Sequence, residues 1–557
     1  MATDVEIARQ FTPRPIAEIA EALGVNSEDL QPYGQAIAKV DLNALNRPRA
    51  RKEKARLVLV SAITPTPAGE GKTTTSIGLA QAFHAKKESV CLALREPSLG
   101  PCMGVKGGAC GGGYSQVMPL DRINLHFTGD FHAITSANNL LAAMIDNHLH
   151  FGNKLRLDVR KILWRRVMDM NDRALRNIVS GMGGTGQGVP RENGFDITAA
   201  SEIMAVLCLS TDVDDLRTRL ERILVAYDLD GKPVYAKQMD CIGAMMALLR
   251  DALSPNLVQS FEGTPAFIHG GPFANIAHGC NSVLATRMAM HFADWTITEA
   301  GFGADLGAEK FFDIKCRQAG LDPDAVVLVA TIRALKMHGG KAKNDLDGAD
   351  VAAVQGGLPN LEKHIENIQT LGKPPVVALN RFGTDSDAEI EVVRKRCAEL
   401  NVEFAVSNHH PEGGKGALDL ADAVMAAVSR GSEPFTPVYA LTDTPEEKIH
   451  QVAQKLYGAD DIALAPAAKR DIKNLAAMGY ADLPICIAKV PGSLSDNAAL
   501  IGRPTGFTVN VRNVVVNAGA GFLVVITGNI FRMPGLPRDP MASHMDLMPD
   551  GEIIGLE

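Results

Sequence analysis

Leu57-Val58-Leu59-Val60-Ser61-Ala62-Ile63 is followed, two residues later, by Thr66-Pro67-Ala68-Gly69-Glu70-Gly71-Lys72-Thr73. The first run is rich in β-branched residues and almost entirely apolar, which is typical of a parallel strand buried on both faces. After Thr73, apolar residues recur at helical spacing as far as Phe83. A strand, a glycine-containing loop and a helix beginning with Lys-Thr form the context of a phosphate-binding P-loop. These segments therefore predict an α/β fold with a nucleotide site.

The predicted loop suits a phosphate because its backbone N–H groups and the helix N-terminus both favour an anion. Lys72 is expected to reach the β- and γ-phosphates, and the Thr73 hydroxyl to ligate Mg²⁺. Thr66 stands where the pattern usually has its first glycine. The alternative is an ordinary strand–turn–helix with a solvated lysine. The agreement of spacing and context favours nucleotide binding.

The composition is that of an ordinary globular protein, with 46% hydrophobic and 22% charged residues. A chain of 557 residues is too long for one core, so two to four domains are expected. The net charge of −8 argues against a general nucleic-acid or membrane-surface role. No apolar run approaches the roughly 18 residues of a membrane-spanning helix. We expect neither a nucleic-acid partner nor a membrane partner.

The cysteines and the N-terminus bear on the cellular compartment. Nine cysteines are scattered singly, without a CxxC pair, which favours reduced thiols over a disulfide framework. The segment Met1 to Glu6 lacks the basic and apolar regions of a signal peptide. Both observations predict a cytoplasmic location.

Strand-like apolar runs alternate with helical patterns along much of the chain. The runs lie at residues 57–63, 90–94, 265–269, 326–330, 375–379 and 402–406. Such alternation is typical of a parallel sheet covered by helices on both faces.

The composition changes at Gly356-Gly357-Leu358-Pro359-Asn360, and the alternation beyond it includes a strand expected at 437–440. We predict a P-loop nucleotide-binding and catalytic domain at 1–355, a smaller α/β domain at 356–460 and a C-terminal α/β domain at 461–557. The predicted fold class is α/β, with a large P-loop NTPase-like domain of mostly parallel sheet plus the two smaller domains.

Arg95 and Glu96 directly follow the strand expected at 90–94. Ligands of open α/β sheets bind beyond the carboxyl ends of the strands, so Arg95 is expected on the same side as the P-loop. An arginine there can hold an oxyanion with two hydrogen bonds and neutralise charge during phosphoryl transfer. The alternative is an arginine paired with Glu96 or another carboxylate.

Two glycine-rich stretches stand out. Seven glycines between residues 100 and 113 are costly in chain entropy, so either close backbone approach to an anion or unusual turns require them. Residues 181–190 read equally as a substrate loop or a connector. Downstream of the first stretch, His126, Asp130 and His132 are candidate acid/base groups or candidates for hydrogen bonds to the ligands of Mg²⁺, and structural roles are equally consistent with the pattern.

Several long motifs resemble one family. Gly104 to Tyr114 and Val329 to Gly340 are similar to the two signature segments of formate–tetrahydrofolate ligase, and Thr66 to Thr73 is similar to that family's P-loop, including the first threonine. Gly301 to Phe311 and Met533 to Pro537 also fit. The resemblance extends from about residue 10 to the C-terminus.

This resemblance implies that ATP, formate and tetrahydrofolate react to give ADP, phosphate and 10-formyltetrahydrofolate through formyl phosphate. It implies Mg²⁺ with ATP as cofactor, a monovalent cation as a further candidate cofactor, tetrahydrofolate as co-substrate and a homotetramer. The 356–460 domain is then expected to contribute to the folate site. The implied catalytic residues are Lys72, Arg95, Glu96 and Asp130.

The implied folate site includes Phe302 and Phe382, with the pterin stacked on Phe382. Where the family places a tryptophan on the opposite face, this chain has His409-His410. An imidazole can stack, but with less area than an indole. Phe382 as an ordinary loop aromatic is the alternative reading.

Two rival functions use the same loop. A P-loop ATPase that delivers a metal cluster or a partner protein would need paired cysteines or a switch-like surface, and no cysteine pair is present in the sequence. Another ATP-dependent ligase would activate a different small carboxylate. Of the three hypotheses, only formate–tetrahydrofolate ligase predicts 10-formyltetrahydrofolate from ATP, formate and tetrahydrofolate.

Overall fold

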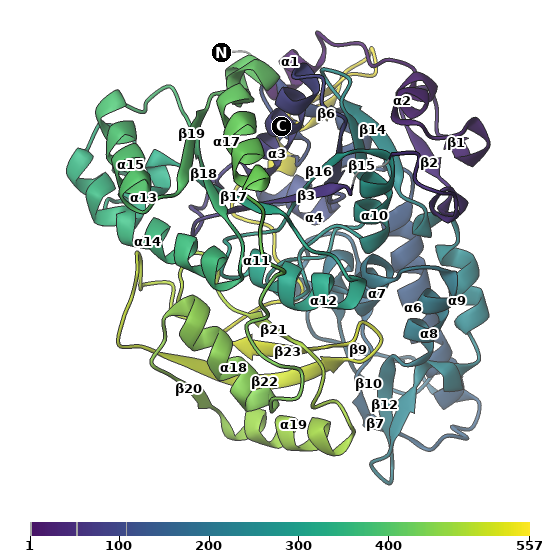
Figure 1. Cartoon of the computed structure of the whole chain (residues 1–557). Coiled ribbons are helices and arrows are strands. Elements are labelled where there is room, and N and C mark those ends of the chain that lie inside the picture. The colour runs from purple at the N-terminus through teal and green to yellow at the C-terminus, as the bar shows by residue number, and fades with distance from the viewer. Residues whose placement is uncertain (1–2, 52–53, 107, 557) are drawn as a thin grey trace.

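The computed structural model describes residues 3–51, 54–106 and 108–556 (Figure 1). Its main element is a mixed sheet of 12 strands. In order across the sheet, ten of them are β1 (Leu30–Pro32), β2 (Ala38–Val40), β14 (Asn256–Ser260), β15 (Pro265–Ile268), β4 (Val90–Leu94), β16 (Trp295–Glu299), β3 (Arg56–Ala62), β17 (Ala325–Ala330), β18 (Pro375–Asn380) and β19 (Glu403–Ser407). The other two are β6 (Ser115–Met118), which pairs with β14, and β5 (Gly111–Gly112), which pairs with β6.

The seven strands from β15 to β19 in this order are all parallel to their neighbours. Their carboxyl ends therefore share one border of the sheet, which we call the carboxyl edge. The remaining pairs, on the β1 side, are antiparallel. The expected mostly parallel α/β sheet is confirmed.

Helices cover both faces of the parallel strands (Figure 1). Alternate residues of β3 pack against α3 (Lys72–Ala85) and α17 (Leu418–Ser429) on one face. The others face α14 (Val351–Thr370) and α10 (Val283–Phe292). Because both faces are buried, the strands read as continuous apolar runs.

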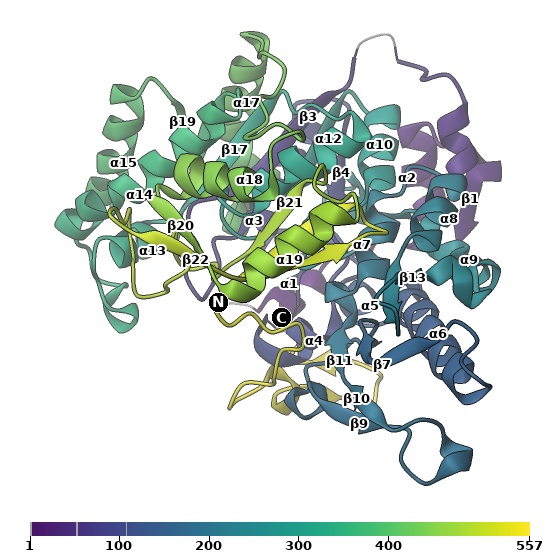
Figure 2. The ribbon, with the colours of Figure 1, turned by 90° about the horizontal axis from the view of Figure 1, so that it is seen from below.

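Two further regions lie beyond the carboxyl edge (Figures 1 and 2). One, inserted between β6 and β14, contains α6 (Asp130–His150), α7 (Glu202–Leu209), α8 (Val213–Glu221), α9 (Ile242–Leu249), β7 (Leu157–Ile162), β8 (Arg166–Met168), β9 (Ile178–Ser180), β10 (Arg191–Asn193), β11 (Phe195–Ile197), β12 (Leu224–Asp228) and β13 (Pro233–Tyr235). The other is a four-stranded C-terminal sheet in the order β20 (Asp461–Leu464), β22 (Thr508–Asn517), β23 (Phe522–Thr527) and β21 (Ile485–Ala488), with α18 (Pro445–Val452) and α19 (Pro466–Ala477) beside it.

The main sheet continues across residue 356. β18 and β19, expected in a separate smaller domain, pair in parallel with β17 and with each other. The stretch Gly356 to Asn360, expected at a boundary, lies inside α14. A Cβ atom on Gly357 would lie 2.0 Å from the carbonyl oxygen of Leu335, so this glycine serves close helix packing. The division into domains at 356 and 461 stays a prediction.

Three further segments can be compared with the sequence analysis. Residues 437–440 form no strand, because Pro437 lacks an N–H and the N–H of Val438 is donated to Asp313. The strand β16, in the centre of the sheet, was not anticipated. The stretch 181–190 joins β9 to β10 in a hairpin that projects from the body of the molecule in Figure 2.

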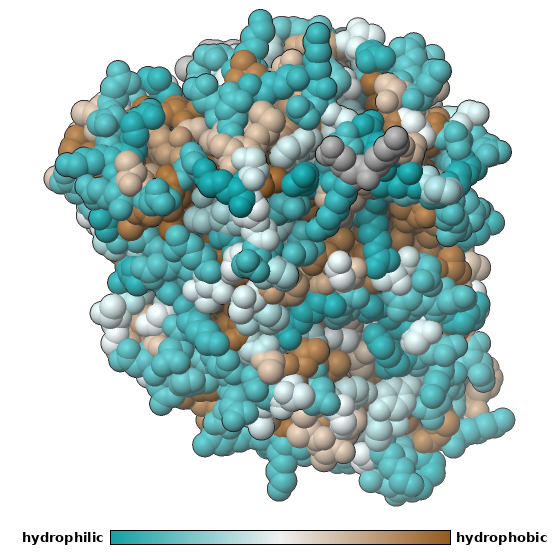
Figure 3. Space-filling view, in the orientation of Figure 1, coloured by the Kyte–Doolittle hydropathy of each residue, from teal (hydrophilic) through white to brown (hydrophobic). Residues whose placement is uncertain are grey.

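Among the described residues, no helix is long and apolar enough to span a membrane. The face shown in Figure 3 is covered mainly by hydrophilic side chains, with hydrophobic ones scattered between them.

Candidate active site

The loop between β3 and α3 has the geometry of an anion site. Gly69 and Gly71 have φ angles of +80° and +76°, a left-handed region in which a Cβ atom is unfavourable. Gly71 directly precedes α3, whose first N–H groups lack intrahelical acceptors. A Cβ atom on Gly71 would lie 2.5 Å from the Asn380 amide nitrogen, so the loop also needs glycine for space. The predicted strand–loop–helix unit is confirmed as local structure.

Glu70 holds this loop closed. Its buried carboxylate accepts hydrogen bonds from the backbone N–H of Thr66 (2.6 Å) and from the Thr331 hydroxyl. The Asn380 amide donates to the Glu70 carbonyl at 3.1 Å. Burial raises the pKa of Glu70, and the bonds from Thr331 and Thr66 oppose that rise. Thr66 and Glu70 were predicted to bind nucleotide. In the structure, the Thr66 N–H and the Glu70 carboxylate stabilise the loop instead.

Lys72 and Thr73 face a carboxylate that the sequence did not reveal. The Thr73 hydroxyl donates to Glu299 Oε2 at 2.6 Å, and Glu299 is the last residue of β16. Burial lowers the pKa of Lys72 to about 8, and the nearby Lys106 and Arg95 contribute to that lowering. Glu299 acts in the opposite direction. The first turn of α3 thus begins beside a compact group of charges.

Arg95 joins the same group. Its Nε lies 3.3 Å from Glu299 Oε1, and its side chain is 25% exposed. Lys106 is exposed to solvent, and desolvation by the surrounding protein, followed by the charge of Arg95, lowers the pKa of its ammonium. Three cations, Lys72, Arg95 and Lys106, therefore share one carboxylate. This surplus of positive charge suits an anionic ligand.

Glu96 and Asp130 form a separate, buried group. Asp130 is the first residue of α6, and it accepts from Lys39 Nζ (2.8 Å) and Asn256 Nδ2 (2.7 Å). Burial raises the pKa of Glu96 well above its ordinary value, and the negative charge of Asp130 raises it further. Within the described chain, Glu96 Oε2 has no hydrogen-bond partner. Asp130 is thus neutralised by Lys39, whereas Glu96 keeps an unused oxygen.

Phe382 lies just beyond the end of β18, half-buried at the carboxyl edge. The Arg333 guanidinium lies 4.0 Å from the centre of its ring, in a cation–π contact that covers one face. Phe302, in the loop after β16, has a φ of +59°, unusual for a residue other than glycine. Such strained backbone concentrates at functional sites, although the strain alone assigns no role.

His409 and His410 differ sharply in environment. His409 is fully buried, with Nδ1 2.8 Å from the Ser407 hydroxyl and Nε2 3.4 Å from that of Thr75. Burial lowers the pKa of His409 to about 3. The structure therefore leaves this ring no open face for the pterin expected on it. His410 is half-exposed, and its Nε2 lies 3.6 Å from Asp4.

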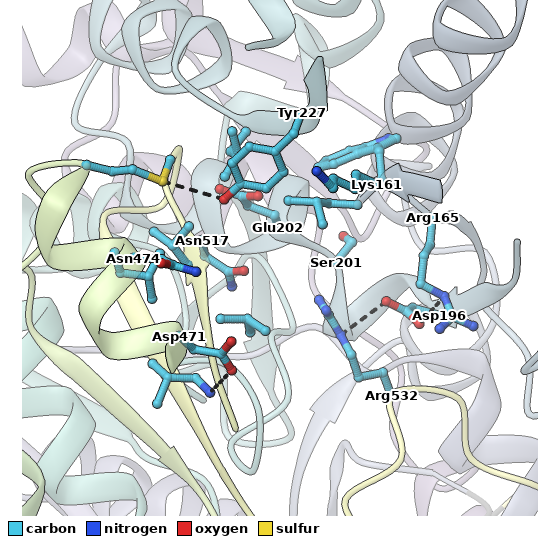
Figure 4. A pocket seen from close by; sticks show the side chains of 18 of the residues that line it. Lys161, Arg165, Asp196, Ser201, Glu202, Tyr227, Asp471, Asn474, Asn517 and Arg532 are labelled. Carbon is cyan, nitrogen blue, oxygen red and sulfur yellow. Dashed lines mark hydrogen bonds and ion pairs between the residues drawn. The ribbon is translucent and has the colours of Figure 1, made fainter. Parts of the chain in front are cut away.

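A cavity of about 840 Å³ lies beside the C-terminal sheet (Figure 4). Asp196 joins Arg165 (3.2 Å) and Arg532 (3.1 Å) in its wall, and Glu202 accepts from the Gly519 N–H at 2.6 Å. Of the residues that the structure describes, those lining the cavity include none of the predicted site residues. These polar contacts tie the C-terminal segment to the inserted region.

A family model described as formate–tetrahydrofolate ligase matches residues 2–557. The chain belongs to the formate–tetrahydrofolate ligase family. It is therefore an ATP-dependent ligase that joins formate to tetrahydrofolate, giving 10-formyltetrahydrofolate, ADP and phosphate. Membership confirms the resemblance inferred from the motifs. It decides against both the cluster-delivering ATPase and a ligase for another carboxylate.

The structure places beside the predicted site residues several others that the sequence analysis did not select. Glu299 ends an unanticipated strand, although the aromatic and β-branched run Trp295-Thr296-Ile297-Thr298 before it was a usable signal. Lys106 and Arg333 lie inside the two signature segments, but nothing in their spacing indicated a role. Asn380, immediately after the apolar run of β18, was seen only as a neighbour of Phe382.

Proposed function

We propose that the ligase activates formate as formyl phosphate at the carboxyl edge, with the P-loop holding ATP. The observation that carries this proposal is the group of Lys72, Thr73 and Arg95 around Glu299 at the start of α3. Three strand ends contribute to it, and they lie side by side in the sheet. Fixed cations at that position suit a phosphoryl group in transfer.

The chemistry explains why phosphorylation is needed. Oxide is too basic to leave from formate directly. A formate oxygen attacks the γ-phosphorus, the bond to the β,γ-bridging oxygen breaks, and ADP leaves. The N10 amine of tetrahydrofolate then attacks the formyl carbon, the carbon–oxygen bond to phosphate breaks, and N10 loses a proton. The products are 10-formyltetrahydrofolate and phosphate.

Lys72 and Arg95 have different roles in this proposal. Lys72 reaches the β- and γ-phosphates of ATP and neutralises charge during the first step. Arg95 holds the phosphate of formyl phosphate after ADP departs, because its planar guanidinium can make two parallel hydrogen bonds. On binding, the phosphate replaces Glu299 as the partner of Arg95. Water must be excluded at this stage, since a mixed anhydride hydrolyses readily.

The residues present fit Mg²⁺. The Thr73 hydroxyl and the Glu299 carboxylate already lie 2.6 Å apart and are the oxygen ligands this ion prefers. In the described part of the chain, no group of three or more His, Cys, Asp or Glu side chains is placed to hold a metal by itself. Phosphate oxygens of ATP would complete the coordination, and the ion would offset negative charge on them.

Glu96 is the better candidate for accepting the N10 proton. Its Oε2 has no hydrogen-bond partner in the described chain and can accept a proton, whereas Asp130 is engaged by Lys39 and Asn256. Asp130 then keeps Lys39 and Asn256 in place. Phe382 is the proposed stacking surface for the pterin, on the ring face opposite Arg333.

The remaining implications of family membership are proposals as well. These are the homotetramer, the cytoplasmic location, the monovalent cation and the contribution of residues 356–460 to the folate site. Sedimentation of the purified chain tests the tetramer, and activity in sodium, potassium and ammonium salts tests the cation.

Arg95 variants test the division of roles. Arg95→Ala should lose ligation while fluorescent ATP-analogue titration shows nearly unchanged affinity, and Arg95→Lys should also be poor, because an ammonium lacks the planar fork. Arg250→Ala, at an exposed arginine paired with Asp251, is the matched control and should retain both. If Arg95→Ala lost ATP affinity as severely as Lys72→Ala does, the proposed roles would be wrong.

A further inference from the structure

Two side chains connect the entrance of the P-loop to the C-terminal region. His338 Nε2 lies 2.9 Å from the carbonyl oxygen of Thr64, two residues before the loop, and its Nδ1 lies 3.1 Å from the N–H of Gly502. Asn360 donates from the same amide nitrogen to the Thr64 hydroxyl (3.0 Å) and to the Gly502 carbonyl (2.8 Å). Thr64 and Gly502 are thus joined by two parallel bridges.

The partners determine which tautomer His338 adopts. The Thr64 carbonyl can only accept a hydrogen bond, so Nε2 must carry the proton. The Gly502 N–H can only donate, so Nδ1 must be unprotonated. A second proton on the ring would place two N–H groups against each other. The bridge therefore requires the neutral Nε2–H form.

Helix packing brings the two bridging residues together. His338 ends α13 (Ile332–His338), and Asn360 lies in the middle of α14. A Cβ atom on Gly357 would meet the Leu335 carbonyl at 2.0 Å, and one on Gly339 would meet that of Ala353 at 1.9 Å. Gly357, in the stretch expected at a domain boundary, and Gly339 thus allow the close approach on which the bridge depends.

A second buried contact joins the C-terminal region to the carboxyl edge. Lys489, directly after β21, lies 2.7 Å from Asp305, and neither side chain is exposed. Asp305 follows the loop that contains Phe302. A buried ion pair whose partners come from distant segments fixes their relative position.

We propose that His338 and Asn360 are positioning residues, through which the C-terminal region sets the conformation of the phosphate-binding loop. The inference rests on the proposed role of that loop in binding ATP. Thr64 leads directly into the loop, so a displaced Thr64 shifts the backbone that faces the phosphates. Displacements of about 1 Å near a reacting group can cost roughly 100-fold in rate.

The test compares three variants of the full-length protein. His338→Leu removes both bonds of the ring and should lower kcat/KM for ATP about tenfold or more, while KM for tetrahydrofolate changes less than twofold. His338→Gln can donate and accept at the same separation and should stay within about threefold of wild type. Gly357→Ala should behave like His338→Leu, because it separates the two helices.

Amide hydrogen exchange gives a readout that needs no nucleotide. His338→Leu should speed exchange in peptides covering residues 64–75 and around Gly502, and leave other regions unchanged. Asn360→Leu should have the same pattern, and the double variant should show less than the sum of the two effects, because both residues share the same partners. In ¹⁵N spectra, the His338 signal should show the Nε2–H tautomer.

His148→Gln is the matched control, since it changes a histidine that accepts the Leu155 N–H at the far end of α6. It should leave kcat/KM for ATP and exchange at 64–75 unchanged. Equal kinetic losses for all three substrates, uniform exchange increases, or failure of His338→Gln to restore function would overturn the proposal. If Lys72→Ala kept full ATP affinity while the exchange effects remained, the nucleotide role of the loop would be wrong and the bridge would stand.

Discussion

The carboxyl edge has a proposed phosphate end, at β4, β16 and β3, and a proposed pterin end, at β18 and β19. At the phosphate end, loops from three strands are held by charges and hydrogen bonds among Lys72, Thr73, Arg95 and Glu299. At the pterin end, Phe382 is half-buried and contacts Arg333 on one face. The first is held by charges without any ligand, and the second is a half-buried ring with one face covered by Arg333.

The difference follows from the ligands. A transferring phosphoryl group needs fixed charges, since reorganising dipoles during the reaction would raise the barrier. A pterin is held by area and stacking, which tolerate small shifts. We therefore expect substitutions at the phosphate end to reduce turnover, and substitutions at the pterin end to raise only the tetrahydrofolate requirement.

The largest effect is expected for Lys72→Ala. Loss of a fixed cation from the β- and γ-phosphates should cost roughly 3–4 kcal/mol or more in the transition state, by analogy with loss of one preorganised donor. Ligation measured by 10-formyltetrahydrofolate formation should be nearly abolished. Lys86→Ala, at the other end of α3, is the control and should be active. Turnover like wild type in folded Lys72→Ala would remove the P-loop from the mechanism.

Phe382→Ala probes the pterin end. Stacking of a base on an aromatic ring contributes roughly 1–3 kcal/mol, so the KM for tetrahydrofolate should rise about 5- to 150-fold. The KM values for ATP and formate should stay nearly constant. A structure with a folate analogue whose pterin lies away from Phe382 would refute the placement, even with the activity confirmed.

The pH dependence of the phosphate end follows from Lys72. Its pKa of about 8 means that the charged form, which ATP requires, is lost as pH rises above that value. The kcat/KM for ATP, which reports the free enzyme, should fall about tenfold per pH unit on the alkaline side. A profile flat to pH 10 would show that Lys72 stays charged or is not needed.

His409→Gln should have the smallest kinetic effect, below twofold in KM for tetrahydrofolate, because the ring is buried. Its effect should appear in stability. The folded pKa of about 3 lies below the ordinary 6.5, so the neutral ring stabilises the fold above pH 6.5, and this is lost as pH falls toward 3. Unfolding of the variant should depend less steeply on pH in that window, by up to roughly 1.4 kcal/mol per unit. A large rise in the tetrahydrofolate KM would instead place His409 at the pterin.

His410→Ala completes the comparison at the pterin end. The half-exposed ring has Asp4 as its nearby charged group, so we expect a change in tetrahydrofolate KM below about twofold. A rise comparable to that of Phe382→Ala would mean that His410 supplies the second stacking face.

The β3–loop–α3 unit could be predicted because its signal is local: an apolar run, glycines at left-handed positions and Lys-Thr at a helix start. Glu299 could not, since it reaches Thr73 from 226 residues further along the chain. Which carboxylate meets Arg95 is likewise a matter of strand order, because Glu299 and not the adjacent Glu96 is its partner.

The pterin end was harder to predict because burial depends on packing. His409 lies under α3, where a Cβ atom on Gly78 would be 2.5 Å from that of His409. Nothing in the run Ser407 to Gly416 shows that contact. Gly356 to Asn360 lies inside a helix although glycine and proline usually interrupt helices, because tertiary packing of α13 on α14 overrides that tendency.

The central claim, that formate attacks the γ-phosphorus of ATP at the phosphate end, is tested most directly with ¹⁸O-labelled formate. When both formate oxygens are ¹⁸O, one ¹⁸O atom per turnover should appear in inorganic phosphate, because the formate oxygen bonded to phosphorus leaves with it when N10 attacks the carbon. Mass spectrometry of the phosphate measures this. Phosphate free of ¹⁸O, formed together with 10-formyltetrahydrofolate, would contradict the account.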